Sequence, residues 1–166
     1  ALSKVYDGTR WQRCWVHKTA NVLNSLPKSL QAQAKSKLHQ IWQAASKDEA
    51  QRHFDDFVKT YEAKYPKAVQ CLAKDHDALF TFYDFPAEHW RHIRTSNPIE
   101  STFATVRLRT HKVRGCFSAS TVLSMAFKLC QCAEKRWIRL HRPERLADVV
   151  SGVKFVNGLE EKRIAA

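Results

Sequence analysis

The sequence has 166 residues, with 28 lysines and arginines against 16 aspartates and glutamates, so its formal net charge is +12. This length suits one ordinary domain with a buried core, and 44% hydrophobic residues are too many for a disordered chain. Only 4 glycines and 5 prolines are few for an all-β fold, and no apolar run approaches the roughly 18 residues of a membrane span. We therefore expect a soluble, mainly α-helical protein with a little β structure.

The N-terminal half predicts one strand followed by several amphipathic helices. Alternating aromatic and polar side chains predict a short strand over residues 9–16, and a helix follows over residues 17–26. Pro27 ends that helix and suits the first turn of another, which runs to about residue 45. Ser46, followed three residues later by a glutamate, is a capping-box pattern that begins a third helix. Pro66 begins a fourth.

The C-terminal half predicts two longer helices. Asn97 is a good N-cap and Pro98 a good first residue for a helix that runs into a basic turn. A longer helix, with its apolar stripe ending at Trp137, spans about residues 119–140, and Pro143 stops the chain from continuing it.

Glu100 allows two readings. Three residues after Asn97, its carboxylate completes a capping box and lies favourably near the positive end of the helix. Alternatively, a carboxylate on a rigid helix in a basic region is suited to bind a divalent metal ion. Arg107, seven residues further on, lies on the same helical face as Glu100.

The Cys14–His17 pair resembles half of a zinc site. The chain offers only Cys130 and Cys132 as a second pair, and two residues apart on a helix point to different sides. We therefore do not expect zinc, and the alternative is a packed strand-to-helix junction in which His17 bonds locally.

The excess charge is unevenly spread along the chain. Residues 1–44 carry +6, residues 45–89 carry −3, residues 90–145 carry +9, and residues 146–166 are balanced. Lysines and arginines can simply solvate helix faces, but a concentrated positive region also attracts polyanions by releasing their counterions. The +9 block favours nucleic acid as a partner.

The first residue is Ala1 and the only methionine is Met125, so we expect a processed chain or a fragment. Five cysteines at irregular spacing do not form a disulfide framework, which favours a reducing, cytoplasmic compartment.

Two long runs of sequence carry a family resemblance. They are residues 12–28 (QRCWVHKTANVLNSLPK) and residues 94–110 (RTSNPIESTFATVRLRT), supported by residues 85–90 (FPAEHW) and parts of residues 126–137. In this order they resemble the Mutator-type transposases of bacterial insertion sequences, over almost the whole chain.

The resemblance implies a DDE transposase with an RNase H-like catalytic core. In that family two aspartates and one glutamate bind two divalent metal ions, Mg²⁺ or Mn²⁺, and the glutamate lies in the Asn-x-x-Glu pattern. Here that glutamate is Glu100, and Asn97 and the Cys14–His17 element are structural parts of the family pattern. Arg107 matches the family's basic residue, and we expect Arg109, Lys112 and Arg114 to contact the DNA backbone.

The resemblance also divides the chain. Residues 1–26 correspond to a strand-to-helix piece of the core, 27–90 to an all-helical insertion, 91–145 to C-terminal core helices, and 146–166 to a tail. Both catalytic aspartates are expected upstream of residue 1, because Asp7 does not match the family position. The implied partners are the element ends, target DNA and further copies of the protein in a synaptic complex, in the bacterial cytoplasm near the nucleoid, without a membrane.

Three functions are therefore open: the C-terminal part of an active transposase, a catalytically dead remnant or DNA-binding regulatory fragment of one, and an unrelated helical RNA-binding protein. A fragment with one of three metal-binding carboxylates is expected to be inactive alone.

Overall fold

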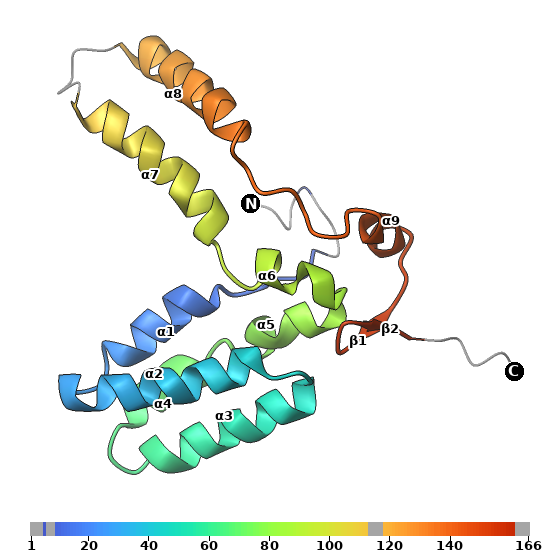
Figure 1. The fold of residues 1–166 in the computed structure, drawn as a ribbon. Coiled ribbons are helices and arrows are strands. Elements are labelled where there is room, and N and C mark those ends of the chain that lie inside the picture. The colour runs from blue at the N-terminus through green and yellow to red at the C-terminus, as the bar shows by residue number, and fades with distance from the viewer. Residues whose placement is uncertain (1–4, 6–8, 113–117, 162–166) are drawn as a thin grey trace, which may run out of the picture. The chain divides into compact units, whose positions relative to one another are not determined.

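The computed structural model describes residues 5, 9–112 and 118–161. The chain divides into two compact units (Figure 1). The first comprises Ala1–Thr95 and His141–Ala166, and the second comprises Ser96–Leu140. The described part of the chain is mainly helical with little strand, as the sequence predicts.

Four helices open the first unit, and α2 and α3 pack side by side with α1 and α4 against them (Figure 1). Two of the predicted starts are confirmed. The Ser46 hydroxyl accepts a hydrogen bond from the Glu49 N–H at 3.2 Å, and Pro66 is the first residue of its helix. The bounds are α1 Trp15–Leu23, α2 Lys28–Gln43, α3 Lys47–Tyr61 and α4 Pro66–Ala73.

Short helical turns rich in aromatic side chains complete this core. The Tyr83 hydroxyl is buried and donates to the Ala44 carbonyl at 3.0 Å, while Trp90 packs edge-on against the Tyr83 ring. Burial is the main reason that the pKa of Tyr83 is raised far above its usual range. The turns are α5 His76–Phe80, the 3-10 helices η2 Thr81–Asp84 and η3 Ala87–His89, and α6 Trp90–Ile93.

The strand predicted over residues 9–16 is wrong. Residues 9–14 form no regular element, and Trp15 is the first residue of α1. The Trp15 ring is buried and its Nε1 donates to the Leu79 carbonyl at 2.9 Å, and the Arg13 N–H donates to the Ala78 carbonyl at 2.7 Å. In the described chain no strand pairs with this segment. Of residues 9–16, Trp15 alone is buried and Trp11 is 55% exposed, so the alternation does not mark one buried face.

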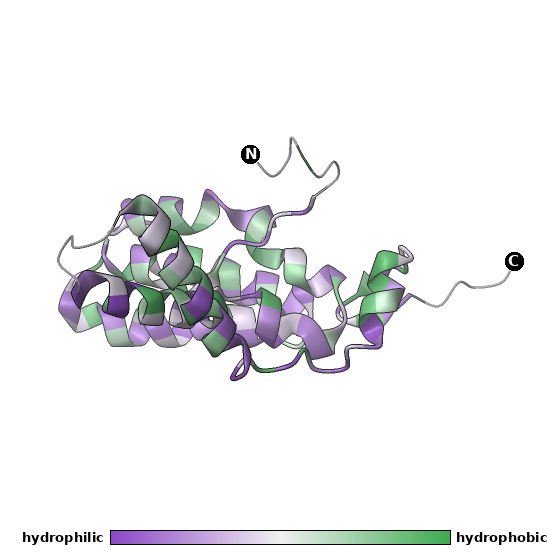
Figure 2. Ribbon diagram, turned by 90° about the horizontal axis from the view of Figure 1, so that it is seen from above, coloured by the Kyte–Doolittle hydropathy of each residue, from purple (hydrophilic) through white to green (hydrophobic). Residues whose placement is uncertain are grey.

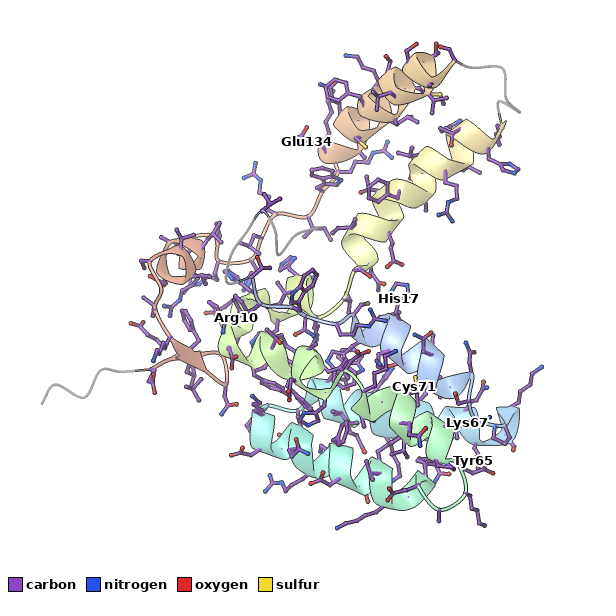
Figure 3. All side chains as sticks on the ribbon, turned by 180° about the vertical axis from the view of Figure 1, so that it is seen from behind. Arg10, His17, Tyr65, Lys67, Cys71 and Glu134 are labelled. Atoms are coloured by element: carbon purple, nitrogen blue, oxygen red, sulfur yellow. The ribbon has the colours of Figure 1, made fainter. Side chains whose placement is uncertain are left out.

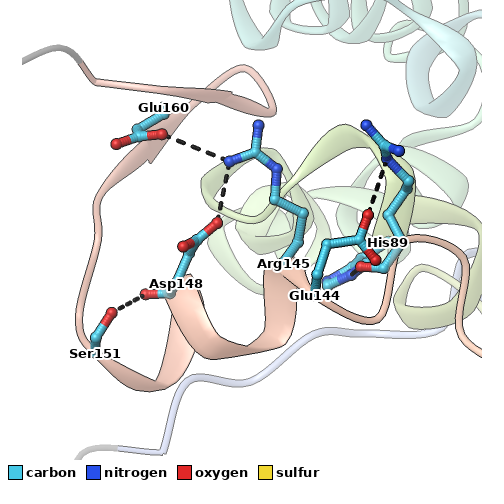
Figure 4. Close-up of polar contacts among 7 residues, drawn as sticks. His89, Glu144, Arg145, Asp148, Ser151 and Glu160 are labelled. Carbon is cyan, nitrogen blue, oxygen red and sulfur yellow. Dashed lines mark hydrogen bonds and ion pairs between the residues drawn. The ribbon is translucent and has the colours of Figure 1, made fainter.

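The C-terminal segment of the first unit forms α9 Arg145–Val150 and a two-stranded hairpin, β1 Phe155–Val156 with β2 Leu159–Glu160. Arg145 joins these elements by contacting Asp148 at 3.0 Å and Glu160 at 3.5 Å (Figure 4). Gly158 has a positive φ of 79°, and a Cβ there would lie 2.6 Å from Ala87 Cβ. Only glycine fits this turn, which anchors the hairpin on η3.

A buried charge connects α1 to α4 and α5. Lys18 is 2% exposed, and its ammonium donates to the Cys71 carbonyl at 2.7 Å and to the Asp75 carboxylate. Asp75 also pairs with Arg13 at 3.4 Å. An ammonium can be this deeply buried only because both partners satisfy it.

The second unit consists of α7 Asn97–Lys112 and α8 Ala119–Glu134, which pack against each other. The predicted long helix ends six residues early, because the Arg136 and Trp137 N–H groups close the last turn on the Ala133 and Glu134 carbonyls at 2.9 and 3.1 Å. Trp137 therefore lies beyond α8, off the predicted stripe.

The helices are banded with hydrophobic and hydrophilic residues (Figure 2). No described residue of α7 or α8 is fully buried, and the second unit exposes several large hydrophobic side chains. They are Ile99, Phe103, Leu108, Val122, Leu123, Phe127, Trp137 and Ile138. No helix in the described ranges combines the length and the apolar character that crossing a bilayer requires.

We predict that Asp75→Asn destabilises the first unit by about 3 kcal/mol at pH 7, because it leaves the Lys18 ammonium buried without its counter-charge. The hydrogen bond from Lys18 is the main reason that the pKa of Asp75 is lowered in the folded protein. In the unfolded chain this carboxyl has a pKa of about 3.9, so as the pH falls it binds its proton before the carboxyl of the folded protein does. This contribution is therefore present above about pH 4 and is lost as the pH falls through the lowered folded value.

Urea unfolding at pH 7 measures the loss of stability in Asp75→Asn, and urea unfolding at pH 3 measures how much of that difference disappears in acid. Asp77→Asn is the matched control, since that carboxylate lies in the same segment but is fully exposed. Equal stability of the two variants at pH 7 would contradict the prediction.

Candidate metal and nucleic-acid site

Glu100 lies in the first turn of α7 and is held by Ser96. The Ser96 hydroxyl donates to the Glu100 carboxylate, and the Glu100 N–H donates to the Ser96 carbonyl at 3.0 Å. Asn97 is the first residue of α7, so the helix begins one residue earlier than predicted. The predicted N-cap position therefore falls on Ser96 instead of Asn97, and the Ser96 hydroxyl holds the Glu100 carboxylate at a helix start where negative charge is favoured.

Glu100 is exposed and fits as one ligand of a divalent cation, because carboxylate oxygens suit Mg²⁺ and Mn²⁺. Over residues 9–112 and 118–161, no group of three or more histidine, cysteine, aspartate or glutamate side chains is placed to hold a metal ion. A metal that needs several protein ligands would require further carboxylates beside Glu100.

The predicted DNA-binding residues divide between two sides of α7. At about 100° per residue, Arg107 returns to the side of Glu100, roughly 10 Å further along the helix axis. Arg109 and Lys112 turn toward the opposite side. All three side chains are exposed, and Arg114 lies outside the described residues.

A groove separates α7 from α8 on the side away from Glu100. Its volume is about 390 Å³. The Trp137 indole is 54% exposed, and its Nε1 donates to the Thr102 hydroxyl at 3.0 Å. The groove is lined by Ser101, Thr102, Thr105 and Arg109 from α7, and by Leu129, Cys132, Ala133, Arg136 and Trp137 from α8 and the turn after it.

Two residues of this groove, Arg136 and Trp137, are not among the predicted site residues. The predicted helix over residues 119–140 contains both residues and places Trp137 on its apolar stripe. No glycine or proline marks the end of α8 at Glu134, because the next such residue is Pro143. The signal that was available is the run of basic and aromatic residues from Lys135 to Trp137 in a chain expected to bind nucleic acid.

Cys14 and His17 lie at the start of α1 in the first unit. Figure 3 labels His17 on this helix. Cys14 is the N-cap residue, partly buried, and its carbonyl accepts the Lys18 N–H at 3.0 Å. His17 is exposed. The two residues are three apart in sequence, so they lie about one helical turn from each other where α1 begins.

Comparisons with known proteins identify the family of the chain. The family model for transposases of the Mutator family matches residues 1–139. The chain is 56% identical over 159 residues to the transposase for insertion sequence element IST2 of Acidithiobacillus ferrooxidans, covering 96% of this chain and 54% of that protein. It is 47% identical over 158 residues to the transposase for insertion sequence element IS6120 of Mycolicibacterium smegmatis, covering 95% and 49%.

A third relative, the transposase for insertion sequence element ISRM5 of Rhizobium meliloti, is 24% identical over 149 residues, or 90% of this chain and 37% of that protein. The chain therefore spans about half the length, or less, of these relatives. It belongs to the Mutator family of transposases, and its sequence corresponds to part of such a protein.

Proposed function

We propose that this chain is the C-terminal part of an insertion-sequence transposase, and that Glu100 supplies one of three carboxylates for divalent-metal-dependent cleavage and strand transfer of DNA. The observation that carries the proposal is the exposed Glu100 carboxylate, held by Ser96 on the first turn of α7 in a chain of this family. The two aspartates that complete the set would lie upstream of Ala1.

Within the second unit, Glu100 is one of only two acidic residues against eight basic ones. A carboxylate in such a positive region needs a reason beyond solubility, since a lysine or glutamine there would serve DNA binding better. The Ser96 hydroxyl limits the rotamers of Glu100, so little entropy is lost when a cation binds.

When bound, Mg²⁺ or Mn²⁺ would stabilise the charge that develops on the attacking and leaving oxygens at a DNA phosphodiester. Glu100 would position the cation on α7. Arg107, on the same side of the helix, would hold a neighbouring phosphate and keep the backbone in line for displacement. Arg109 and Lys112, with Arg114 beyond the described residues, would contact the backbone without reading its sequence.

The remaining features would serve the same assembly. Residues 1–26 and 91–145 would belong to an RNase H-like core, with the helices of residues 27–90 inserted between them and residues 146–166 as a tail. Cys14, His17 and Asn97 would stabilise this core. The partners would be element ends, target DNA and further copies of the protein in a synaptic complex in the bacterial cytoplasm, associated with the nucleoid.

A second candidate is a catalytically dead remnant, or a DNA-binding regulator, derived from such a transposase. Its support is the share of the relatives that the chain spans, about half, together with the single predicted catalytic carboxylate that the chain carries. An open upstream reading frame with two suitably placed aspartates favours the enzyme, whereas a stop codon or frameshift there favours the remnant.

We predict that Glu100→Gln, in a full-length transposase that contains this chain, reduces mobilisation of the element by more than about 100-fold, because an amide replaces an anionic metal ligand. A plasmid-based mobilisation assay measures the loss. Glu134→Gln is the matched control, as the other glutamate of the second unit, and should retain near-normal mobilisation. Undiminished mobilisation by Glu100→Gln would overturn the proposed role.

The free energy of unfolding of the same variants separates a role of Glu100 in helix stability from a role in metal binding. Glutamine can still accept the Ser96 hydroxyl but lacks the charge that is favoured at the helix start, so Glu100→Gln should lower the free energy of unfolding by about 0.5 kcal/mol. Glu100→Ala removes that contact and should cost about 1 kcal/mol. A variant that folds nearly as stably as the parent protein but does not mobilise the element assigns the loss to chemistry and not to folding.

We also predict that the 166-residue chain alone, with Mg²⁺ or Mn²⁺, does not join a donor end to plasmid DNA. One carboxylate cannot hold two hydrated cations in register. Gel electrophoresis of the plasmid after incubation measures joining, with a complete transposase as the positive control, and any joined product from the purified chain would contradict the prediction.

A further inference from the structure

We propose that the groove between α7 and α8 binds an unpaired nucleotide of a nucleic-acid strand, with its base stacked on Trp137 and its phosphate held by Arg109 and Arg136. This inference rests on the proposed function for its biological setting. It names a partner chemistry for a surface that none of the catalytic roles uses.

The first argument is the exposed indole. Trp137 is 54% exposed although it is the largest apolar side chain of its unit, and the hydrogen bond from its Nε1 to Thr102 fixes the ring at the rim of the groove. A fixed aromatic face beside an open groove is a stacking platform, and every base has a π-face that fits it.

The second argument is the charge at the groove. Arg109 comes from α7 and Arg136 from the turn after α8, so two guanidinium groups from different elements line one groove. No acidic side chain lines it. Guanidinium groups bind phosphate oxygens in a bidentate manner, which suits them to hold a strand rather than merely to raise the surface potential.

The third argument is the floor. Leu129, Cys132 and Ala133 give the groove an apolar base, and its volume of about 390 Å³ lies in the range of small-molecule sites. An apolar floor beside cationic walls matches a nucleotide, which presents an apolar base face and an anionic phosphate. Paired bases within a duplex are stacked on their neighbours and would have to leave the stack to reach the indole.

The geometry of α7 separates this groove from Glu100. Ser101, Thr102, Thr105 and Arg109 face the groove, and Glu100 lies roughly opposite them at about 100° per residue. The carboxylate therefore does not repel a phosphate in the groove directly, and binding there can be measured without the metal site.

The test is fluorescence anisotropy of the complete 166-residue chain with four labelled 20-mers: dT20, rU20, an abasic deoxyribose strand and a DNA duplex. We expect Trp137→Ala to weaken binding of dT20 or rU20 by about tenfold or more, with less than a threefold change for the abasic strand and the duplex. The dT20 and rU20 results assign the nucleotide to DNA, to RNA or to both.

Trp11→Ala is the matched control, because Trp11 is 55% exposed and lies in the first unit. It should leave dT20 binding unchanged. Trp137→Phe keeps an aromatic ring without the hydrogen bond to Thr102, and it should retain affinity within about threefold. An equal loss for Trp137→Phe and Trp137→Ala, or no loss for either, would overturn base stacking.

Arg109→Ala with Arg136→Ala should weaken binding of all strands, including the abasic one, and reduce the salt slope for single strands by about 1. Arg139 is an exposed arginine outside the groove, so Arg139→Ala should weaken binding of these strands less than the groove pair does. Equal losses for the groove pair and for Arg139 would overturn the phosphate role. A failure of these binding results leaves the Glu100 mobilisation assay unaffected, so the two proposals fail separately.

Discussion

The first unit depends on satisfying one buried cation. Lys18 places an ammonium in a buried position, where an unpaired charge would be strongly destabilising. The Cys71 carbonyl and the Asp75 carboxylate satisfy it, and this fixes the direction of α1 relative to α4 and the start of α5. Because Cys14 and His17 lie on the first turn of α1, their position follows from the same contacts.

The second unit is stabilised differently. Its two helices pack against each other without a fully buried described residue, and side-chain hydrogen bonds add contacts near their ends. Ser96 holds Glu100 at the start of α7, the Ser118 hydroxyl accepts from the Thr121 N–H at the start of α8, and Trp137 returns to Thr102. Contacts of this kind leave side chains accessible, which suits a surface that must bind a large anion. They also leave apolar side chains exposed.

Local rules predicted the parts of the structure that local interactions determine. Ser46 and Pro66 begin helices because their effects act within one turn. The alternation of its neighbours predicts a strand at Trp15, but the buried Trp15 ring bonds to the Leu79 carbonyl, which is 64 residues away. The apolar stripe predicts a helix at Trp137, but the Trp137 indole bonds to Thr102, which is 35 residues away. The family pattern in the sequence marks Glu100. The groove cannot be predicted in this way, because its lining depends on where α8 ends.

The two sides of α7 show how one helix can serve two electrostatic tasks. A carboxylate that binds a cation is repelled by a phosphate beside it unless a cation intervenes, and Arg107 shares the side of Glu100, where it offsets part of that repulsion. The groove side carries Arg109 and no acidic side chain, so its positive potential is not reduced by a direct neighbour. About half a turn of helix therefore separates a region suited to a metal ion from one suited to an anionic strand. Since the relative rotation of the two sides is fixed by the helix itself, this arrangement does not depend on how the two units are oriented.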